Sequence, residues 1–446
     1  MDRRVQRRYA MMVQQHMKSS NRNAAGPLLL AGESLAASAT QAAWRFLNNP
    51  NVSLTDLVEP LRQAGRDACR QSESEYVLLA HDWCKIDYKN HSSKPDLRQI
   101  THETDVGYDM TSALLVDAGN GHPLAPMQMH LKTADTLYST ATQPPDVDAH
   151  HRDQVAPTME EAGQWGLERK VVHVIDREAD SLGRLRTWVA AGHLFLVRSD
   201  DRRVLWNGES RLISDIQEHF NSQRLFEPVG EAKHRGHVVS QEVAETEIVL
   251  HRPHSAVIDG RKRQVQGEPL RVRLVVTRLL DDDDFIVAQR TLLTNVFDDG
   301  ISAVQIARWY YWRWLIETFS KLLKSHGQEL EQWQQHSLEP WQQHSGEAIA
   351  RRILVASMAC VIVWSLQHDD ARGSRSHPKD PGPPERPTDE TRLPVYRSSA
   401  AGRLHGTALA QRPAHRNRHR YRPTQAHRQN RHAISNSRRG LPKQGQ

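Results

Sequence analysis

The stretch KVVHVIDREAD, Lys170 to Asp180, decides the predicted fold. Its first six residues are rich in β-branched side chains, which favour a strand, and the acids that follow mark the strand's end. A helical pattern from Ser181 to Ala191 comes next, followed by a second strand-like run, HLFLVRS (His193–Ser199). This alternation of strand and helix predicts an α/β fold.

Upstream of Lys170 the sequence predicts more strands. Three β-type runs, separated by turn residues such as GNGHP, follow one another. They are YVLLAHDWCKIDY, GYDMTSALLVDA and HPLAPMQMHLK. Before Tyr76 the pattern is helical, with one helix in QRRYAMMVQQHM, one ending at Asn49-Pro50 and one from Thr55 to Ser72. We therefore predict a basic helical region at 1–75 and the first part of the α/β core at 76–199.

A second β-rich pattern occupies residues 200–300, in runs such as PLRVRLVVTRL and FIVAQRTLLT. The α/β pattern resumes after it with one long helix from Ser302 to Ser325, so we interpret 200–300 as a β-rich insertion and 301–367 as the second part of the core. The helix of Glu347 to Leu366 closes the fold. Its run of 14 apolar residues, ILVASMACVIVWSL, is shorter than the roughly 20 that span a bilayer, which predicts a buried core helix.

The positive charge lies at one end of the chain. Of the net +6 over 446 residues, residues 368–446 hold 17 Lys and Arg against 6 Asp and Glu, which leaves 42 against 47 for residues 1–367. Global charge therefore does not by itself indicate a nucleic-acid partner for the folded part. The segment 368–446 is a low-complexity basic tail. Its composition predicts disorder, and it fits a frameshifted reading of further helix equally well.

Cysteine usage and the N-terminus indicate the compartment. Cys69, Cys84 and Cys360 lie far apart without CxxC spacing, which excludes a zinc module or a disulfide framework and suits a reducing cytoplasm. The basic start MDRRVQRRYAMM has no apolar run of signal-peptide length. We expect a soluble cytoplasmic protein without a membrane partner.

Two aspartates stand where a purely structural role explains them poorly. Asp82 lies inside the apolar run VLLAHDWCKI, where burying an unpaired carboxylate is unfavourable. Asp176 directly follows the apolar run VVHVI, a position where an aspartate most often caps a helix or turn. Asp180 and Ser181 are better placed to cap the following helix, so we predict no structural role for Asp176. Metal ligation would account for both aspartates.

The helical stretch YYWRWLIETFSKLLK, residues 310–324, carries a polar stripe. Such a stripe alone is most often an exposed face with an Arg/Glu pair at i,i+4. Beside two strand aspartates, however, its glutamate supplies a third carboxylate. Three carboxylates can hold two Mg²⁺ ions for phosphoryl transfer, and cations on the same stripe can bind flanking phosphates. At about 100° per residue the stripe consists of Tyr310, Arg313, Glu317 and Lys324.

Four segments, AAWRFLNNPNVS, HDW, VIDREAD and the pattern Y-x2-R-x3-E-x6-K, together resemble DDE transposases of the bacterial insertion-sequence-four family, the group that contains the transposon-five transposase. The resemblance covers roughly residues 2–367 in collinear order. It implies an RNase H-like core interrupted by a β-rich insertion. It also implies cut-and-paste DNA transposition in the bacterial cytoplasm, at the nucleoid, by a homodimer that binds double-stranded DNA as transposon ends and target.

The resemblance also implies residue roles. The metal-binding catalytic triad, holding two Mg²⁺ ions with Mn²⁺ as a possible substitute, would be Asp82, Asp176 and Glu317. Residues that position the phosphates of the transposon ends would be Tyr310, Arg313 and Lys324. Further DNA contacts would come from Arg45 and Arg198.

This chain departs from the family pattern in three places. Family members usually have further helix before the segment that matches MDRRVQRR, often have a tryptophan where Arg290 lies, and have a helical C-terminal dimerisation region where this chain has its basic tail. An alternative function is therefore an inactive or assembly-defective DNA-binding remnant that occupies transposon ends. A stand-alone RNase H-like nuclease is a third alternative, although it does not require the Tyr, Arg and Lys stripe.

Overall fold

The structure is a computed structural model of the chain. It describes residues 2–18, 41–89, 94–234, 237–324, 328, 330–332 and 345–374. Contacts divide the chain into two units, Met1–Tyr396 and Arg397–Gln446, and every described residue belongs to the first. Most of the predicted tail therefore lies outside the described residues, as does the first half of the helix predicted before Asn49-Pro50.

Helices form the N-terminal region, as the sequence predicts. They are α1 (Arg3–Lys18), a helical segment at 41–47, and α3 (Leu54–Gln71). The hydroxyl of Ser53 caps α3 by accepting a hydrogen bond from the amide of Asp56, a usual way to satisfy a free amide at a helix start. The fully buried Leu57 and Leu61 lie one turn apart on α3 and join the main hydrophobic core.

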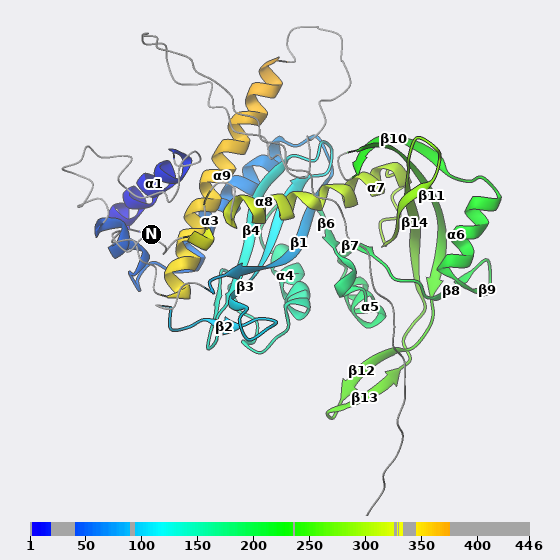
Figure 1. Cartoon of the computed structure of the whole chain (residues 1–446), viewed down its shortest axis with the longest axis horizontal. Coiled ribbons are helices and arrows are strands. Elements are labelled where there is room, and N and C mark those ends of the chain that lie inside the picture. Colours follow the sequence, from blue (N-terminus) through cyan, green and yellow to red (C-terminus); the bar gives the residue numbers. More distant parts are fainter. Residues whose placement is uncertain are drawn as a thin grey trace, which may run out of the picture. The chain divides into compact units, whose positions relative to one another are not determined.

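A mixed β-sheet forms the first half of the core (Figure 1). Its antiparallel part consists of β1 (Tyr76–Asp87), β2 (Arg98–Gln99), β3 (Val106–Asp117), β4 (Pro123–Lys132) and β5 (Leu137–Ser139). Two strands parallel to β1 follow, β6 (Lys170–Ile175) and β7 (Leu194–Arg198). The helical elements between strands are η2 (His151–Gln154), α4 (Val155–Ala162), η3 (Arg177–Ala179) and α5 (Leu182–Ala190). The predicted α/β class is confirmed.

The β-rich block continues the same sheet. Its strands are β8 (Arg203–Trp206), β9 (Glu209–Leu212), β10 (Glu227–His234), β11 (His237–Leu250), β14 (Leu270–Leu280) and β15 (Ile286–Thr294). Because β15 pairs with β7, the strand order runs β5-β4-β3-β1-β6-β7-β15-β14-β11-β8-β9. A separate two-stranded sheet pairs β12 (His254–Ile258) with β13 (Arg261–Val265). The block also contains α6 (Ile213–Ser222), a helix that the sequence analysis did not predict. The insertion and the boundaries of the five predicted regions stay predictions.

Two helices, not one, follow β15. The predicted single helix from Ser302 to Ser325 was wrong, because the chain divides at Arg313 into α7 (Ala303–Trp312) and α8 (Trp314–Lys324). The amide of Arg313 donates to the carbonyl of Tyr310 at 3.2 Å, and the amide of Ile316 donates to the carbonyl of Arg313 at 3.1 Å. Such i→i−3 bonds are tighter than the α-helical pattern and interrupt it. A short 3₁₀ turn, η4 (Leu330–Gln332), comes after α8.

The last described element, α9 (Gly346–Ser374), packs against α1, α3 and β4. Within the described part of the chain, its Gly346–Gln367 segment is the one helix long and apolar enough to cross a membrane, and 72% of its most apolar window is buried inside the protein. That burial supports the predicted role of α9 as a core helix. The buried Arg351 fixes it to the N-terminal region by donating to the carbonyls of Val52 and Leu47, each at 2.8 Å.

A buried ion pair joins α3 to α4, and it provides a test of the fold. Arg62 donates to Oε1 of Glu161 at 2.7 Å and to the carbonyl of Met127 at 3.2 Å. Breaking a buried pair leaves an uncompensated charge, so we expect Arg62→Met to lower the free energy of unfolding by roughly 3 kcal/mol. Arg62→Met combined with Glu161→Gln removes both charges and should recover part of that loss. Urea unfolding measures both, and an unchanged midpoint in the single variant would contradict the pairing.

Candidate active site

The parallel pairing of β1 with β6 places two of the predicted acids side by side. Ala80 lies opposite Val174 in the register, and Asp82 and Asp176 each lie two residues further along. Because strand side chains alternate between faces, both carboxylates project from the face that carries Ala80 and Val174. Asp82 lies in the middle of β1, just beyond the part that pairs with β6. Asp176 directly follows the carboxyl end of β6, the kind of edge where open α/β sheets commonly bind ligands.

Arg313 connects all three predicted acids. At the break between α7 and α8, its Nη1 lies 3.7 Å from Oδ1 of Asp82. Its Nη2 lies 3.9 Å from Oδ2 of Asp176 and donates a hydrogen bond of 2.7 Å to Oε1 of Glu317. The arginine side chain is only 5% exposed. The predicted triad therefore converges, but around a buried guanidinium.

Two further predicted residues contact Asp176. The hydroxyl of Tyr310 donates to Oδ1 of Asp176 at 3.1 Å, and Nη1 of Arg198 lies 4.0 Å from the same oxygen. The register explains the second contact, because Ile175 of β6 pairs with Val197 of β7 and the next residue on each strand forms the contact. Three predicted DNA-binding residues, Tyr310, Arg198 and Arg313, thus contact the carboxylate of Asp176.

Asp176 also has a structural role, contrary to the sequence analysis. Its carboxylate accepts a hydrogen bond of 2.8 Å from the amide of Arg177 and so caps the 3₁₀ turn η3. Asp180 pairs instead with Arg202, which lies far along the chain, and Ser181 begins α5 without a side-chain hydrogen bond. The assumption that Asp180 and Ser181 do the capping was therefore wrong, because a tertiary ion pair engages Asp180.

Burial and mutual repulsion set the charge state of the acids. Burial raises the pKa of Asp82 to about 6; Arg313 opposes this rise, while Glu317 and Asp176 add to it. Burial also acts to raise the pKa of Asp176, but Arg313, the Arg177 amide and the Tyr310 hydroxyl outweigh it and leave that pKa below its usual value. Burial raises the pKa of Tyr310 to about 12, so it remains a neutral hydrogen-bond donor.

Two predicted residues are not brought to the acids. The ammonium of Lys324 lies 3.5 Å from Oε1 of Glu331 in η4, further along the helix that carries Glu317. Arg45 is exposed on the helical segment 41–47 and has no ion pair with any described acid. Of the four residues on the sequence stripe, Tyr310, Arg313 and Glu317 therefore lie together, but Lys324 is too far along α8 to join them.

The three acids have the ligand chemistry that a divalent metal ion requires. Carboxylate oxygens are the donors that Mg²⁺ prefers, and three carboxylates converge here. Nevertheless, among the residues that the structure describes, no three His, Cys, Asp or Glu side chains form a ready metal site. Arg313 lies among the acids, and its Nε and Nη1 are buried without a hydrogen-bond partner in the described chain. Orphaned donors of this kind fit an anionic ligand such as a phosphate.

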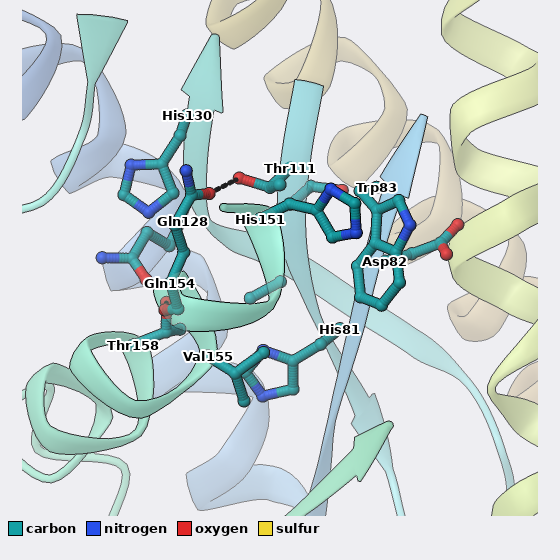
Figure 2. Close-up of a pocket in the computed structure, with 12 residues that line it drawn as sticks. His81, Asp82, Trp83, Thr111, Gln128, His130, His151, Gln154, Val155 and Thr158 are labelled. Atoms are coloured by element: carbon teal, nitrogen blue, oxygen red, sulfur yellow. Dashed lines mark hydrogen bonds between the residues drawn. The ribbon is translucent and has the colours of Figure 1, made fainter. Parts of the chain in front are cut away.

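The opposite face of β1 carries residues that the sequence analysis did not connect. Figure 2 shows His81 and Trp83 turned into a small pocket, while the carboxylate of Asp82 points away from it toward the yellow-green helix. The Trp83 ring stacks on His151 with centroids 4.3 Å apart. No local sequence pattern signals this stacking, because Trp83 and His151 are far apart in the chain. These side chains support the strand that presents Asp82.

Comparisons with known proteins give little further guidance. No family model matches the sequence, and no curated protein matches it. Among solved structures, the chain is similar to a piggyBac transposase in a synaptic complex with hairpin DNA, at 10% sequence identity and a TM-score of 0.28. The similarity covers 86% of this chain and 78% of that chain. At this level the function has to be argued from the site itself.

The raised pKa of Asp82 predicts a pH-dependent stability. A carboxyl whose pKa is about 6 in the folded protein, against 3.8 as its ordinary value, destabilises the fold as the pH rises through this interval. Asp82→Asn should therefore be more stable than wild type by on the order of 2 kcal/mol above pH 6, and the difference should vanish near pH 4. Urea unfolding at several pH values in EDTA measures it. A difference that does not change with pH would show that folding leaves the pKa of Asp82 at its ordinary value, which would contradict the prediction.

Proposed function

We propose that this chain is a DNA transposase of the DDE type that catalyses two-metal phosphoryl transfer. In this proposal it cleaves transposon ends and joins the freed 3′-OH to target DNA. One observation carries the proposal: Asp82, Asp176 and Glu317, which belong to three separate elements, converge on Arg313. These are the acids that the resemblance to insertion-sequence-four transposases selects as catalytic.

The sheet supports an RNase H-like core. The order β4-β3-β1-β6-β7, with three antiparallel strands followed by two parallel ones, is the part that we propose as this core. Two of the acids end or interrupt its central strands, and the third comes from the helix that packs against β1. In this proposal the β-rich block is an insertion that enters and leaves the core through β7 and β15.

Each site residue has a proposed task. Asp82, Asp176 and Glu317 would hold Mg²⁺, with Mn²⁺ as a substitute. When bound, the two ions would neutralise charge at the scissile phosphate and help to deprotonate an attacking water or 3′-OH. Arg313 holds the three carboxylates together. Tyr310 and Arg198 fix the orientation of Asp176, while Lys324 and Arg45 would contact DNA further from the chemistry.

The proposal also covers the oligomeric state, the nucleic-acid partner and the cellular location. Cleavage of paired ends requires two catalytic sites, so we propose a homodimer on double-stranded DNA, in the bacterial cytoplasm at the nucleoid. The alternative is a remnant that binds transposon ends without cleaving them.

A strand-cleavage assay tests the proposal. The substrate is a plasmid carrying the coding sequence with its native flanking DNA, incubated with the full chain and Mg²⁺. We expect breaks at two flanking positions, which stop in EDTA and slow roughly 100-fold or more in Glu317→Gln, because a lost metal ligand removes several kcal/mol of transition-state stabilisation. The matched control is Glu178→Gln, which changes an exposed glutamate near Asp176 that pairs with His151.

The outcomes separate the alternatives. Breaks that persist in Glu317→Gln would remove the proposed triad. Specific binding of the flanking DNA without cleavage would identify the remnant. Breaks spread over the whole plasmid would identify a stand-alone nuclease instead of a transposase.

A further inference from the structure

Arg290 is a cation beside the acid cluster that the proposed function leaves without a task. It lies on β15, opposite Thr277 of β14. Arg198 on β7 lies opposite Leu292, which is two residues further along β15. Since strand residues two apart share a face, Arg290 and Arg198 project from the same face as diagonal neighbours. That face also carries Asp176, through the pairing of β6 with β7.

The surrounding charges leave Arg290 uncompensated. All three nearby carboxylates contact Arg313, and Asp176 additionally contacts Arg198. Among the described residues, no acid lies within ion-pair distance of Arg290, and no side chain accepts a hydrogen bond from it. Its charged neighbours are Arg198 and Arg313, and its other polar neighbours are two tyrosines.

Such an arrangement is unfavourable unless an anion binds to it. Arg290 is half-buried, so its guanidinium has lost part of its hydration as well as lying near two like charges. Burial, together with Arg198 and Arg313, lowers the pKa of Arg290, although Tyr310 acts in the opposite direction. Guanidinium groups bind phosphate oxygens through paired hydrogen bonds, which suits two arginines on one face.

We propose that Arg290 and Arg198 together bind one backbone phosphate of the DNA, next to Asp176. This inference rests on the proposed function for the identity of the anion, since a DNA strand is the phosphodiester that reaches the acid cluster in a transposase. Arg198 links Arg290 to the acid cluster, because Arg198 contacts Asp176 and projects from the same face of the sheet as Arg290. A phosphate held there places the neighbouring phosphodiester within reach of the acids. Arg290 is thus a substrate-binding residue that positions the strand by charge.

The test measures DNA binding without chemistry. A short fluorescein-labelled duplex of unrelated sequence is titrated with the full chain in EDTA over a series of NaCl concentrations. Arg290→Gln should weaken binding about tenfold at low salt and reduce the slope of log Kd against log salt by about one, the value for one lost phosphate contact. Arg290→Lys should keep most of the slope, since it keeps the charge. The matched control is Arg203→Gln, an exposed arginine on β8, which lies beyond β14 and β11 from β15.

Two further measurements exclude a structural role and test the sharing of one phosphate. Removing a cation from a like-charge cluster relieves repulsion, so the unfolding temperature of Arg290→Gln should equal or exceed that of wild type. A structural arginine would give the opposite result. The double variant of Arg198→Gln and Arg290→Gln should lose less affinity than the product of the two single losses, because residues that share one partner are not additive.

The possible results are distinct. Binding and salt slope equal to wild type in Arg290→Gln, or an equal loss in Arg203→Gln, would overturn the inference. Loss of inorganic phosphate binding with no change in DNA binding would also overturn it, because the site would then serve a free anion. Failure of the cleavage assay does not affect these measurements. A chain that never cleaves but shows the Arg290 effect would disprove the transposase and leave the phosphate contact standing.

Discussion

The candidate site depends on the register of three strands, β1, β6 and β7. In that register Asp82, Asp176 and Arg198 form one row, just beyond the residues through which the parallel strands pair. A shift of one residue in either pairing would turn one member of the row to the opposite face, where His81 and Trp83 now lie. Helices α7 and α8 then meet this row with a tyrosine, an arginine and a glutamate. The site is therefore set by backbone hydrogen bonds before any side chain contributes.

A single buried cation, Arg313, reduces the repulsion among the three acids of the site. The three carboxylates repel one another, and the buried Arg313 contacts each of them. Buried ion pairs seldom stabilise a fold relative to apolar packing, since desolvation offsets the attraction. Keeping four charged groups here is therefore better explained by what they do than by what they stabilise. The helix break at Arg313 belongs to the same arrangement, because it occurs at the residue that all three acids share.

Local patterns predicted the parts of the structure that depend on local chemistry. The strands, most helices and the grouping of Tyr310, Arg313 and Glu317 follow from periodicity, and the two unusual aspartates were visible as carboxylates in apolar runs. The break in the helix, the capping role of Asp176 and the pairing of Asp180 with Arg202 depend on contacts between distant segments. For Lys324, the helical spacing correctly predicts the same face as Glu317. It does not predict a shared site, because two turns of α8 separate the two residues. Arg290 was visible only as a departure from the family pattern, and a single arginine in a strand does not by itself indicate a role.

The contacts of the site also govern when it can form. Tyr310 and Asp176 are 134 residues apart in the chain, and the β-rich block lies between them. Contacts of such long sequence separation form late in folding, because closing large loops costs chain entropy before the contacts compensate for it. During synthesis the two aspartates emerge first, without the helix that carries Arg313 and Glu317. A growing or truncated chain therefore holds an incomplete site, so that any strand-breaking activity has to wait for the finished fold.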